Sequence, residues 1–460
     1  MHYFDNVNCI NNFKYKIRDK KLIYKWINEN KLFYGVGWEP YPTSLRIVNW
    51  IRWLITLEVI DKKIEKSLIL QIRWLSKNIE YHLMGNHLIA NAKALIFGGY
   101  YFNGKEASDW LKKGEKIIYK ELDEQILNDG GHFERSPMYH CIILEDLLDL
   151  INIIKSNKSI DNKELLSKLI KKSKLMLSWI ERMKHPDGDI SFFNDSTFGV
   201  SAKPKFLEKY FFELTNFNLK SKSLNKYKLD SSGFSILQNK DIYCLCNTGS
   251  IKPSYMPGHS HAETFSFEAS FKKNRFIVNP GISIYGNTRK RVLQRSTKFH
   301  STLEIDMKNS SEVWSGFRMA NRANVKNRYY KKYLNEELFV AEHDGYINLK
   351  GKPIHIRNWN IKPNNLEIID FIKGSNKHHL SIRFYLHPNC EIIDSDNKSL
   401  LIHNKKKNIS VLMQWELAFR LRIENSKWNI GFNRYIDNNC INLYISQELP
   451  AFNKTIFKVL

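Results

Sequence analysis

The sequence predicts an α+β multidomain fold in which a helical domain precedes an antiparallel β domain. The chain has 460 residues, 43% of them hydrophobic, which is enough apolar surface for two or three packed domains. Apolar residues recur at spacings of three and four as far as about residue 215, and at a spacing of two from about residue 231. The stretch 216–230 between these patterns is rich in Lys, Ser and Asn. We therefore expect an all-α domain over residues 1–225 and a β domain over residues 226–460.

Helical periodicity is strongest in residues 44–60, where SLRIVNWIRWLITLEVI places apolar side chains on one face. Ser44 closely follows Pro42 and is predicted to cap this helix at its N-terminus. Further amphipathic helices are expected at residues 61–76, 86–97, 106–122, 135–154 and 163–183. The short connections between them carry Gly and Asp, which favours a succession of antiparallel helical hairpins.

Period-two alternation begins with GFSILQN at residue 233 and continues through segments such as RFIVNPG and HLSIRFYLH. Turns separate these segments, so they predict about a dozen antiparallel strands. A helical domain followed by a large antiparallel sandwich favours a ligand cleft between the two, because binding sites often lie at domain interfaces. We therefore expect polar residues of both halves to contribute to one site.

The chain is strongly basic, since 71 Lys and Arg residues against 47 Asp and Glu residues give a formal net charge of +24. Such a charge attracts nucleic acid, anionic lipid or acidic polysaccharide. The basic residues are dispersed, often in runs such as HNKKKN that are typical of a solvated surface. The sequence has no motif of a known nucleic-acid-binding module. We therefore expect no nucleic-acid partner.

Cysteine usage and the start of the chain bear on the compartment. Six cysteines are too few for a disulfide scaffold, and the close pair Cys244 and Cys246 lacks the spacing of a zinc knuckle. The opening segment MHYFDNVNCINNFKYKIRDK interrupts every apolar run with charged or amide side chains. It predicts neither a signal peptide nor a transmembrane segment. From this pattern we expect a cytoplasmic protein.

Two segments of the helical half carry polar residues that could do chemistry. In GNHLIANAKAL, Asn86 and His87 begin an otherwise apolar helix, where they could cap it or hold a substrate carboxylate. In NDGGHFERSPMYH, Glu134, Arg135 and Tyr139 follow a Gly-Gly turn. Arg135 and Tyr139 are four residues apart and are expected to share a helix face. Tyr139 is then either a core aromatic residue or a proton carrier.

Two further segments offer ligands for a metal ion. The loop at residues 185–195 carries several carboxylates that could bind calcium, but it does not match an EF-hand. In GHSHAETFSFE, His259 and His261 are two residues apart and would point the same way on an extended chain. Such histidines form zinc sites when other nitrogen or oxygen donors join them, although lone histidines are commonly structural. The same half also carries the polar residues Asn279, Tyr285, Arg295 and His300.

Taken together, six segments resemble the heparinase II/III-like family of polysaccharide lyases, which includes alginate lyases. In family order they are GWEPYPTSLRIVNWIRWL, NHLIANAKAL, DGGHFERSPMYH, GHSHAETFSFE, VNPGISIYG and RSTKFHSTLEID. The most specific part is the pair HSHAETFSFE and FHSTLEID behind DGGHFERSPMY. The resemblance implies an incomplete (α/α) toroid followed by an antiparallel β-sandwich. It also implies a bacterial carbon–oxygen lyase that cleaves a glycan by β-elimination at a uronic acid.

The resemblance assigns roles to individual residues. It places Asn86 and His87 at the substrate carboxylate, Tyr139 as the catalytic acid and also as a base, and His259 as the partner base. We expect neighbouring cations such as Arg135 to lower the pKa of Tyr139 for this work. The residues expected to bind substrate are Glu134, Arg135, Tyr285 and Arg295.

A metal ion with a structural role is also implied, with His261 and His300 as ligands. The acidic ligand that the family usually has before a Pro-Gly turn is replaced here by Asn279. Because a neutral amide binds zinc more weakly than a carboxylate does, we expect zinc at low occupancy or no zinc. The elimination chemistry requires no metal-bound nucleophile.

The function predicted from the sequence is a lyase for acidic polysaccharide or oligosaccharide that contains uronic acid, in envelope or capsular polysaccharide metabolism. The alternative is a noncatalytic protein that binds acidic glycan on the same scaffold. The combination of His87, Tyr139, His259 and His300 favours catalysis, because binding alone needs no phenol and imidazoles in that arrangement.

Overall fold

The computed structural model describes residues 2–8, 13–157, 162–218, 228–416 and 418–460. Their contacts divide the chain into two compact units. The first, here the helical unit, comprises Met1–Ile126, Ile143–Lys174 and Tyr210–Asn216. The second, here the β unit, comprises Leu127–Ile142, Leu175–Lys209 and Phe217–Leu460. The domain boundary expected at residues 225 and 226 lies outside the described residues.

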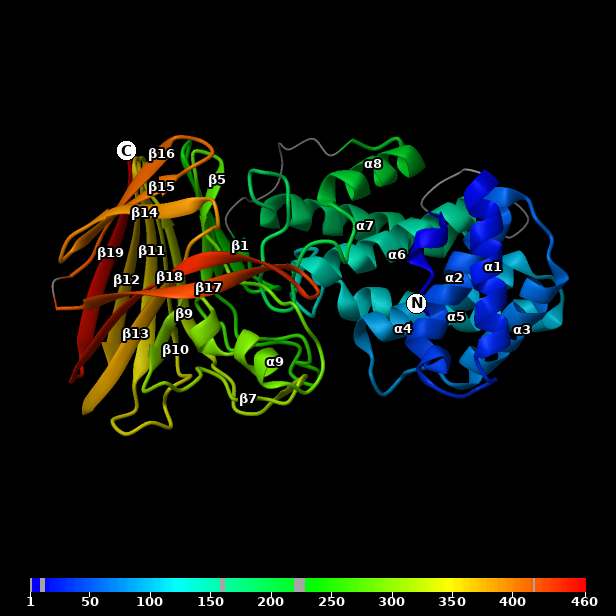
Figure 1. Ribbon diagram of the computed structural model, residues 1–460, viewed down its shortest axis with the longest axis horizontal. Coiled ribbons are helices and arrows are strands. Elements are labelled where there is room, and N and C mark those ends of the chain that lie inside the picture. The colour runs from blue at the N-terminus through cyan, green and yellow to red at the C-terminus, as the bar shows by residue number, and fades with distance from the viewer. Residues whose placement is uncertain (1, 9–12, 158–161, 219–227, 417) are drawn as a thin grey trace. The chain divides into compact units, whose positions relative to one another are not determined.

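The helices follow the predicted order, with ends that differ by a few residues (Figure 1). They are α1 (Phe13–Glu29), α2 (Pro40–Leu57), α3 (Lys62–Lys77), α4 (Gly85–Tyr101), α5 (Lys105–Gln125), α6 (Pro137–Ser156), α7 (Lys163–Met183), α8 (Pro204–Thr215) and the short α9 (Arg289–Gln294). Three single turns of 3-10 helix are η1 (Asp5–Asn8), η2 (Val36–Trp38) and η3 (Thr297–Phe299). The helical region is thus confirmed, while its closure into an incomplete toroid stays a prediction.

The predicted cap at Ser44 is wrong, and the reason is local. Helix α2 begins at Pro40, so Ser44 lies inside it and its hydroxyl donates to the Pro40 carbonyl at 2.8 Å. Proline fits the first turn because the amide hydrogen that it lacks has no partner there. The next helix does have a side-chain cap, since Asp61 accepts from the backbone N–H groups of Lys63 and Ile64.

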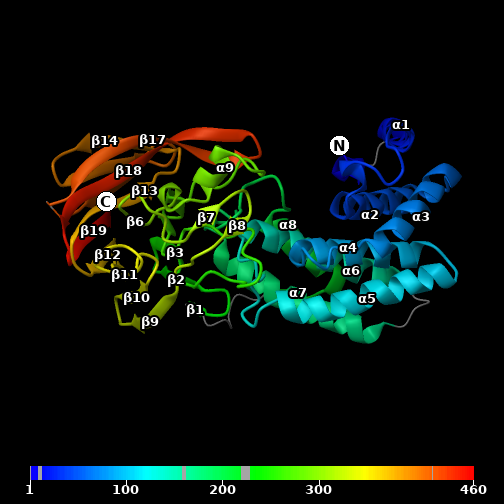
Figure 2. The same cartoon turned by 90° about the horizontal axis from the view of Figure 1, so that it is seen from below.

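Helix α4 is the most deeply buried helix of the helical unit, and Figure 2 shows it beside α5. Its one buried cation, Lys93, lies 2.8 Å from an Asp146 carboxylate oxygen and 2.5 Å from one of Asp149. Both carboxylates lie on α6, so this buried ion cluster joins two helices. Removing one member would leave a buried charge without its partner, which is costly.

Among the described residues, the strands form three antiparallel sheets and one hairpin. The first sheet has the order β1-β2-β3-β4-β5, the largest has β14-β15-β16-β19-β12-β11-β10-β9, the third has β17-β18-β13-β6, and the hairpin is β7-β8 (Figure 1). The strands are β1 (Lys228–Leu229), β2 (Phe234–Gln238), β3 (Ile242–Asn247), β4 (Phe267–Phe271), β5 (Asn274–Ile277), β6 (Leu303–Ile305), β7 (Val313–Trp314), β8 (Arg318–Met319), β9 (Val325–Lys332), β10 (Glu337–His343), β11 (Ile354–Lys362), β12 (Asn365–Lys373), β13 (Lys377–Tyr385), β14 (Cys390–Ser395), β15 (Ser399–Asn404), β16 (Ile409–Gln414), β17 (Arg420–Gly431), β18 (Arg434–Glu448) and β19 (Ala451–Val459).

Side chains from all three sheets share one apolar core, as the period-two alternation predicts. Phe267, Trp359, Phe384 and Phe457 are among its fully buried members. Strand β10 shows the alternation directly, because every second residue from Glu337 to His343 is buried. The β region of the prediction is therefore confirmed.

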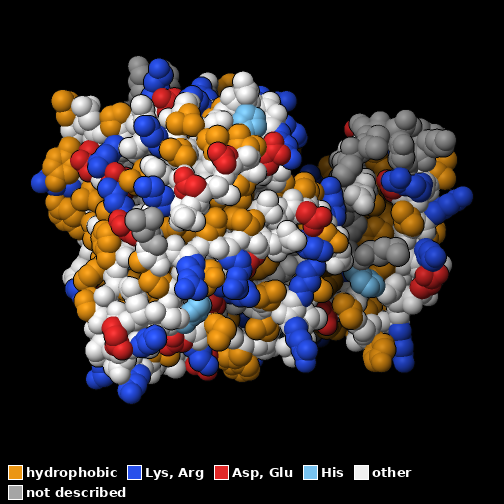
Figure 3. Space-filling model, turned by 60° about the vertical axis from the view of Figure 1, so that its left-hand side comes forward, with side chains coloured by type: hydrophobic (Ala, Val, Ile, Leu, Met, Phe, Trp, Pro, Cys, Tyr) orange, Lys and Arg blue, Asp and Glu red, His pale blue; other side chains and the backbone are white. Residues whose placement is uncertain are grey.

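The surface agrees with the dispersed charge of the sequence. On the face shown in Figure 3, Lys and Arg side chains are interspersed with hydrophobic and acidic ones and do not gather in one patch. Within the described ranges, no helix combines the length and the apolar character needed to cross a bilayer.

Candidate active site

The candidate site lies in the β unit and centres on two tyrosines and a histidine. The hydroxyl oxygens of Tyr139 and Tyr285 are 2.9 Å apart. The ring of Tyr139 lies against the ring of His259, with 4.0 Å between centroids and a tilt of 32°. The Nε2 atom of His259 is 3.7 Å from a carboxylate oxygen of Glu134. The structure thus brings together four residues that the sequence predicted separately.

Local sequence explains the position of Tyr139. Helix α6 begins at Pro137, and the Ser136 hydroxyl accepts a hydrogen bond from the backbone N–H of Tyr139 at 3.1 Å. The same hydroxyl donates to the Asp195 carbonyl oxygen at 2.6 Å. The first turn of α6 is therefore tied to the loop that carries Asp195.

Asp195 is the electrostatic centre of the site, and it is fully buried. It accepts from His259 Nδ1 at 2.8 Å, from His261 Nε2 at 2.7 Å and from both terminal nitrogens of Arg291. Burial alone would raise the pKa of Asp195, but Arg291 and the two histidines hold it well below the usual value. Asp195 is therefore ionised.

An ionised carboxylate can only accept hydrogen bonds, which fixes the tautomer of the neutral His259 ring. Its Nδ1 carries the hydrogen that is donated to Asp195, so in the neutral ring Nε2 carries the lone pair. That atom faces Glu134. The imidazole is thus oriented as a proton acceptor.

Tyr139 has the opposite character. Burial raises its pKa well above the usual value, and the nearby Tyr285, Asp195 and Glu134 act in the same direction. The phenol is therefore protonated at neutral pH and is suited to donate a proton. The predicted lowering of this pKa by Arg135 is wrong, because Arg135 does not face the phenol.

The two arginines predicted to bind substrate, Arg135 and Arg295, both donate to backbone carbonyl oxygens. Arg135 precedes α6, has a positive φ of 59° and donates to the carbonyl oxygens of Ser231 and Ser250. It therefore shares no helix face with Tyr139. Arg295 is fully buried and donates to the carbonyl oxygens of Ser260 and Arg318. These contacts hold the loops beside the site, and substrate binding by either arginine stays a prediction.

Close to Asp195, the side chains of His261, Glu263 and His300 converge. Their candidate ligand atoms all lie within 4.8 Å of one another, and all three side chains are buried. His261 Nδ1 and His300 Nε2 are 3.1 Å apart, and His300 Nε2 is 3.3 Å from a Glu263 carboxylate oxygen. That oxygen, Oε2, has no hydrogen-bond partner among the described residues.

The hydrogen bonds that His261 and His300 make to residues outside this cluster fix the tautomers of the two rings. His261 donates from Nε2 to Asp195, and His300 donates from Nδ1 to the Ser296 carbonyl, so two nitrogen lone pairs face each other. Burial lowers the pKa of His261 to about 4 and that of His300 well below its usual value. Burial also raises the pKa of Glu263. A proton on Glu263 would satisfy only one of these lone pairs, whereas a divalent cation would accept both, and the donor set fits zinc.

Glu263 was not among the predicted ligands, although its place two residues after His261 was a signal. The predicted ligand Asn279 is buried, and its side-chain oxygen Oδ1 accepts a hydrogen bond from the backbone N–H of Ser301 at 3.5 Å. The Asn279 amide nitrogen has no partner in the described part of the chain. Its role as a ligand stays a prediction.

The other predicted residues belong to other segments of the chain. Asn86 and His87 begin α4 in the helical unit, where the His87 ring packs on Tyr41 at 4.5 Å and its Nδ1 is 3.2 Å from Glu80. Their role at a substrate carboxylate stays a prediction. In the loop considered for calcium, Asp187 forms a two-point ion pair with Arg275 instead.

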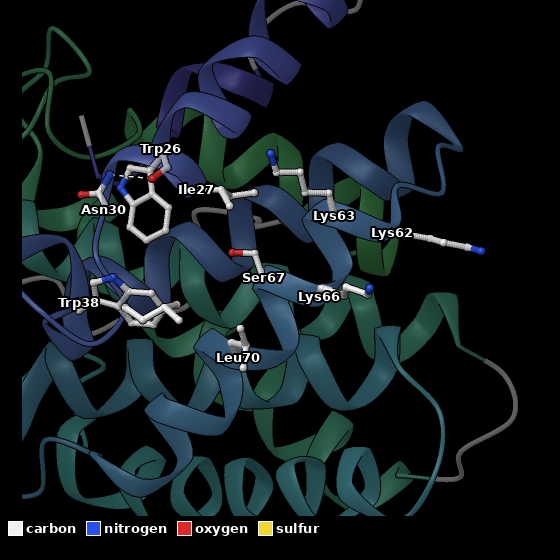
Figure 4. A pocket seen from close by; sticks show the side chains of 10 residues that line it. Trp26, Ile27, Asn30, Trp38, Lys62, Lys63, Lys66, Ser67 and Leu70 are labelled. Carbon is white, nitrogen blue, oxygen red and sulfur yellow. Dashed lines mark hydrogen bonds between the residues drawn. The ribbon is translucent and has the colours of Figure 1, made fainter.

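A separate cavity of about 540 Å³ lies in the helical unit. Figure 4 shows Trp26 and Trp38 on one side of it and lysines of α3 on the other. None of the predicted site residues lines it.

Comparison with solved structures defines the class of fold. The chain aligns with a crystal structure of heparinase III at a TM-score of 0.76, with 18% identity, covering 99% of this chain and 75% of that one. It aligns with a heparan sulfate lyase of Pedobacter heparinus at a TM-score of 0.66, with 17% identity, covering 98% and 74% of the two chains. The fold is thus that of these structures, a helical region followed by antiparallel sheets.

Sequence comparisons name the family. Residues 63–221 match the model described as heparinase II/III N-terminus, and residues 222–456 match heparinase II/III-like, C-terminal. The chain belongs to the heparinase II/III-like family. It is 23% identical to heparin-sulfate lyases of Bacteroides stercoris, over 81% of this chain, and of Bacteroides thetaiotaomicron, over 72%. It spans 58% and 57% of the lengths of these two relatives.

Proposed function

We propose that the protein is a polysaccharide lyase that cleaves an acidic, uronic-acid-containing glycan by β-elimination. Membership of the family supports this proposal, as do relatives named heparin-sulfate lyases. Those names make heparan sulfate the first substrate to test. The net charge of +24 suits a polyanionic substrate.

One observation carries the proposal: a protonated phenol packs directly against an imidazole that a buried carboxylate orients as a base. The rings of Tyr139 and His259 are 4.0 Å apart, and His259 donates to Asp195 at 2.8 Å. An acid and a base on adjacent side chains are what an elimination needs, because one proton leaves the substrate while another must reach the departing oxygen.

The proposed reaction proceeds as follows. His259 Nε2 takes the proton from C5 of the uronate, and the electron pair of that C–H bond forms the C4–C5 double bond. The C4–O4 bond breaks, and the departing O4 takes the phenolic proton of Tyr139. Proton exchange with solvent then returns His259 to the neutral form and Tyr139 to the phenol. Tyr285, at 2.9 Å from Tyr139, hydrogen-bonds the phenol before and after transfer.

The C5 proton is acidic enough only if the neighbouring carboxylate is neutralised. We assign this task to Asn86 and His87, on the family resemblance of NHLIANAKAL. An amide and an imidazole can both donate to a carboxylate. Glu134, which faces His259, is assigned to substrate orientation.

We also propose a zinc ion held by His261, Glu263 and His300. Glu263 supplies the carboxylate that Asn279 lacks, and a bound cation would supply positive charge between the two facing imidazole lone pairs. Its role is structural, because His261 also donates to Asp195 and so shares the carboxylate that orients His259. No step of the proposed reaction needs a metal-bound nucleophile.

The product provides the test. Elimination creates a conjugated unsaturated uronate that absorbs ultraviolet light, whereas binding and hydrolysis do not. We expect an absorbance increase with one or more of heparan sulfate, chondroitin, hyaluronan, alginate or a bacterial capsular glycan. Glycan binding without absorbance would instead favour the noncatalytic alternative.

A further inference from the structure

Two exposed phenylalanines stand beside the catalytic group. Phe317 is 42% exposed, and its ring lies 6.0 Å from that of His259 and 5.4 Å from that of Tyr285. Phe432 is 37% exposed and lies 5.0 Å from the Tyr285 ring. Single exposed hydrophobic residues are ordinary, but two that contact one catalytic tyrosine call for a reason.

The turn that carries Phe317 is anchored by a hydrogen bond from Arg291. Phe317 belongs to the tight turn between β7 and β8, where Ser315 has a positive φ of 55°. Arg291 donates from Nε to the Gly316 carbonyl at 3.0 Å, and it also pairs with Asp195. Arg291, which forms the ion pair with Asp195, therefore also anchors the turn that carries Phe317.

Phe432 is fixed in a comparable way on a different element. It lies in the turn between β17 and β18, where Asn433 donates from its backbone N–H to the Ser283 carbonyl at 2.9 Å. Asn429 donates from its side chain to the Pro280 and Gly281 carbonyls. These contacts tie the hairpin to the segment that leads into Tyr285.

Exposed basic side chains follow both phenylalanines and Tyr285 in the sequence. Arg318 directly follows Phe317 and Arg434 closely follows Phe432, and both arginines are exposed. Exposed Arg289 and Lys290 lie at the start of α9, a few residues after Tyr285. A pyranose ring has an apolar C–H face that packs on an aromatic ring, while its hydroxyl and acid groups project at the edge toward such cations.

We propose that Phe317 and Phe432 form an aromatic subsite that binds a sugar ring next to the cleaved linkage of an acidic glycan. The inference rests on the proposed function, because it takes the group around Tyr139 as the place of cleavage. The two phenylalanines contribute packing area to the bound chain and do not take part in proton transfer. They are specificity residues, and their effect is on binding.

Binding is measured by calorimetry with heparan sulfate oligosaccharides of defined length, in a Tyr139→Phe background in which turnover is expected to be slow. Phe317→Ala and Phe432→Ala are each expected to weaken affinity about tenfold, the size of one aromatic contact. Phe317→Tyr keeps the ring and should retain affinity. The matched control is Phe452→Ala, because Phe452 is 48% exposed and lies on β19, opposite Phe371 of β12. In the active enzyme, the two alanine variants should raise KM and leave kcat nearly unchanged.

The outcomes separate this inference from the function on which it rests. Cleavage by the unaltered protein, with normal affinity and KM in both alanine variants, overturns the subsite alone. Phe-dependent binding without any ultraviolet product supports the subsite and overturns the lyase. If the protein neither binds nor cleaves these oligosaccharides, both proposals fail for heparan sulfate. An equal loss in Phe452→Ala shows a general effect on folding and also overturns the subsite.

Discussion

Replacing Asp195 by Asn tests the electrostatic centre of the site. The change keeps the shape of the side chain but removes the charge that accepts from Arg291, His259 and His261. Breaking a buried ion pair by removing one partner costs about 3–5 kcal/mol, because the other charge stays buried. Arg291 and Asp195 are both fully buried, so we expect the free energy of unfolding to fall by about that amount.

Urea denaturation at pH 7 measures this change in free energy. Asp189→Asn is the matched control, because Asp189 pairs with the exposed Lys203 and should cost less than about 1 kcal/mol. The double variant Asp195→Asn with Arg291→Met should recover part of the loss, since no unpaired charge remains. Turnover should also fall roughly 10²- to 10⁴-fold, because His259 loses the acceptor that fixes its tautomer. A loss of stability below about 1 kcal/mol in Asp195→Asn would refute a charged, buried pair.

Three further predictions concern other parts of the structure. Burial lowers the pKa of His140 to about 3, so the unfolded chain takes up a proton below about pH 6.5 that the folded chain does not, and His140 alone should lower the stability by roughly 3 kcal/mol between pH 6.5 and pH 4, in addition to the effect of the other buried histidines; a level pH profile of urea denaturation would contradict this. Glu263→Gln should reduce bound zinc, measured by elemental analysis of untagged protein, and Asn279→Asp should raise it if Asn279 is also a ligand; unchanged zinc in Glu263→Gln removes Glu263 from the site. Lys93→Met should lower the free energy of unfolding by about 3–5 kcal/mol, because it removes the buried cation that Asp146 and Asp149 share and leaves Asp146 without its ion-pair partner, whereas Lys77→Met at the exposed end of α3 should stay within about 0.5 kcal/mol.

The sequence predicts those parts of the structure that depend on local pattern. The helices from α2 to α7 and the strands β2 to β6 and β10 to β13 appear where the periodicity places them, because period follows directly from which side chains are buried. The described residues hold nineteen strands rather than the predicted dozen or so. The predicted ends of the helices differ from the observed ends by a few residues, since helix ends depend on capping residues and on local backbone conformation. Pro40 at the start of α2 left Ser44 inside the helix, and the positive φ of Arg135 placed that residue before α6.

Some residues of the candidate site are likewise predictable from the sequence, and others are not. Tyr139, His259 and Tyr285 are recognisable from family segments, and the structure brings them together. The pairing of Asp195 with Arg291 joins residues 96 positions apart, so no local pattern could show it. Arg291 lies in the run RKRVLQR, where nothing distinguishes it from its exposed neighbours Arg289 and Lys290.

Burial also reversed one electrostatic expectation. The pKa of Tyr139 is raised, because burial disfavours the charged phenolate and Tyr285, Asp195 and Glu134 act in the same direction. Sequence alone could not give this direction, since it depends on which groups face the phenol. A protonated phenol is consistent with the proposed reaction, in which Tyr139 is the acid and His259 is the base.

The most direct test of the lyase proposal is ultraviolet absorbance during incubation with heparan sulfate, comparing the unaltered protein with Tyr139→Phe. Phenylalanine keeps the packing of the ring against His259 and deletes the proton that the departing oxygen needs. The account predicts a steady rise in absorbance for the unaltered protein and a rate lower by roughly 10²-fold or more for the variant, with an unchanged unfolding transition. Equal rates for the two proteins would contradict the assignment of Tyr139 as the acid, and a lack of product from every acidic glycan tested would contradict the lyase itself.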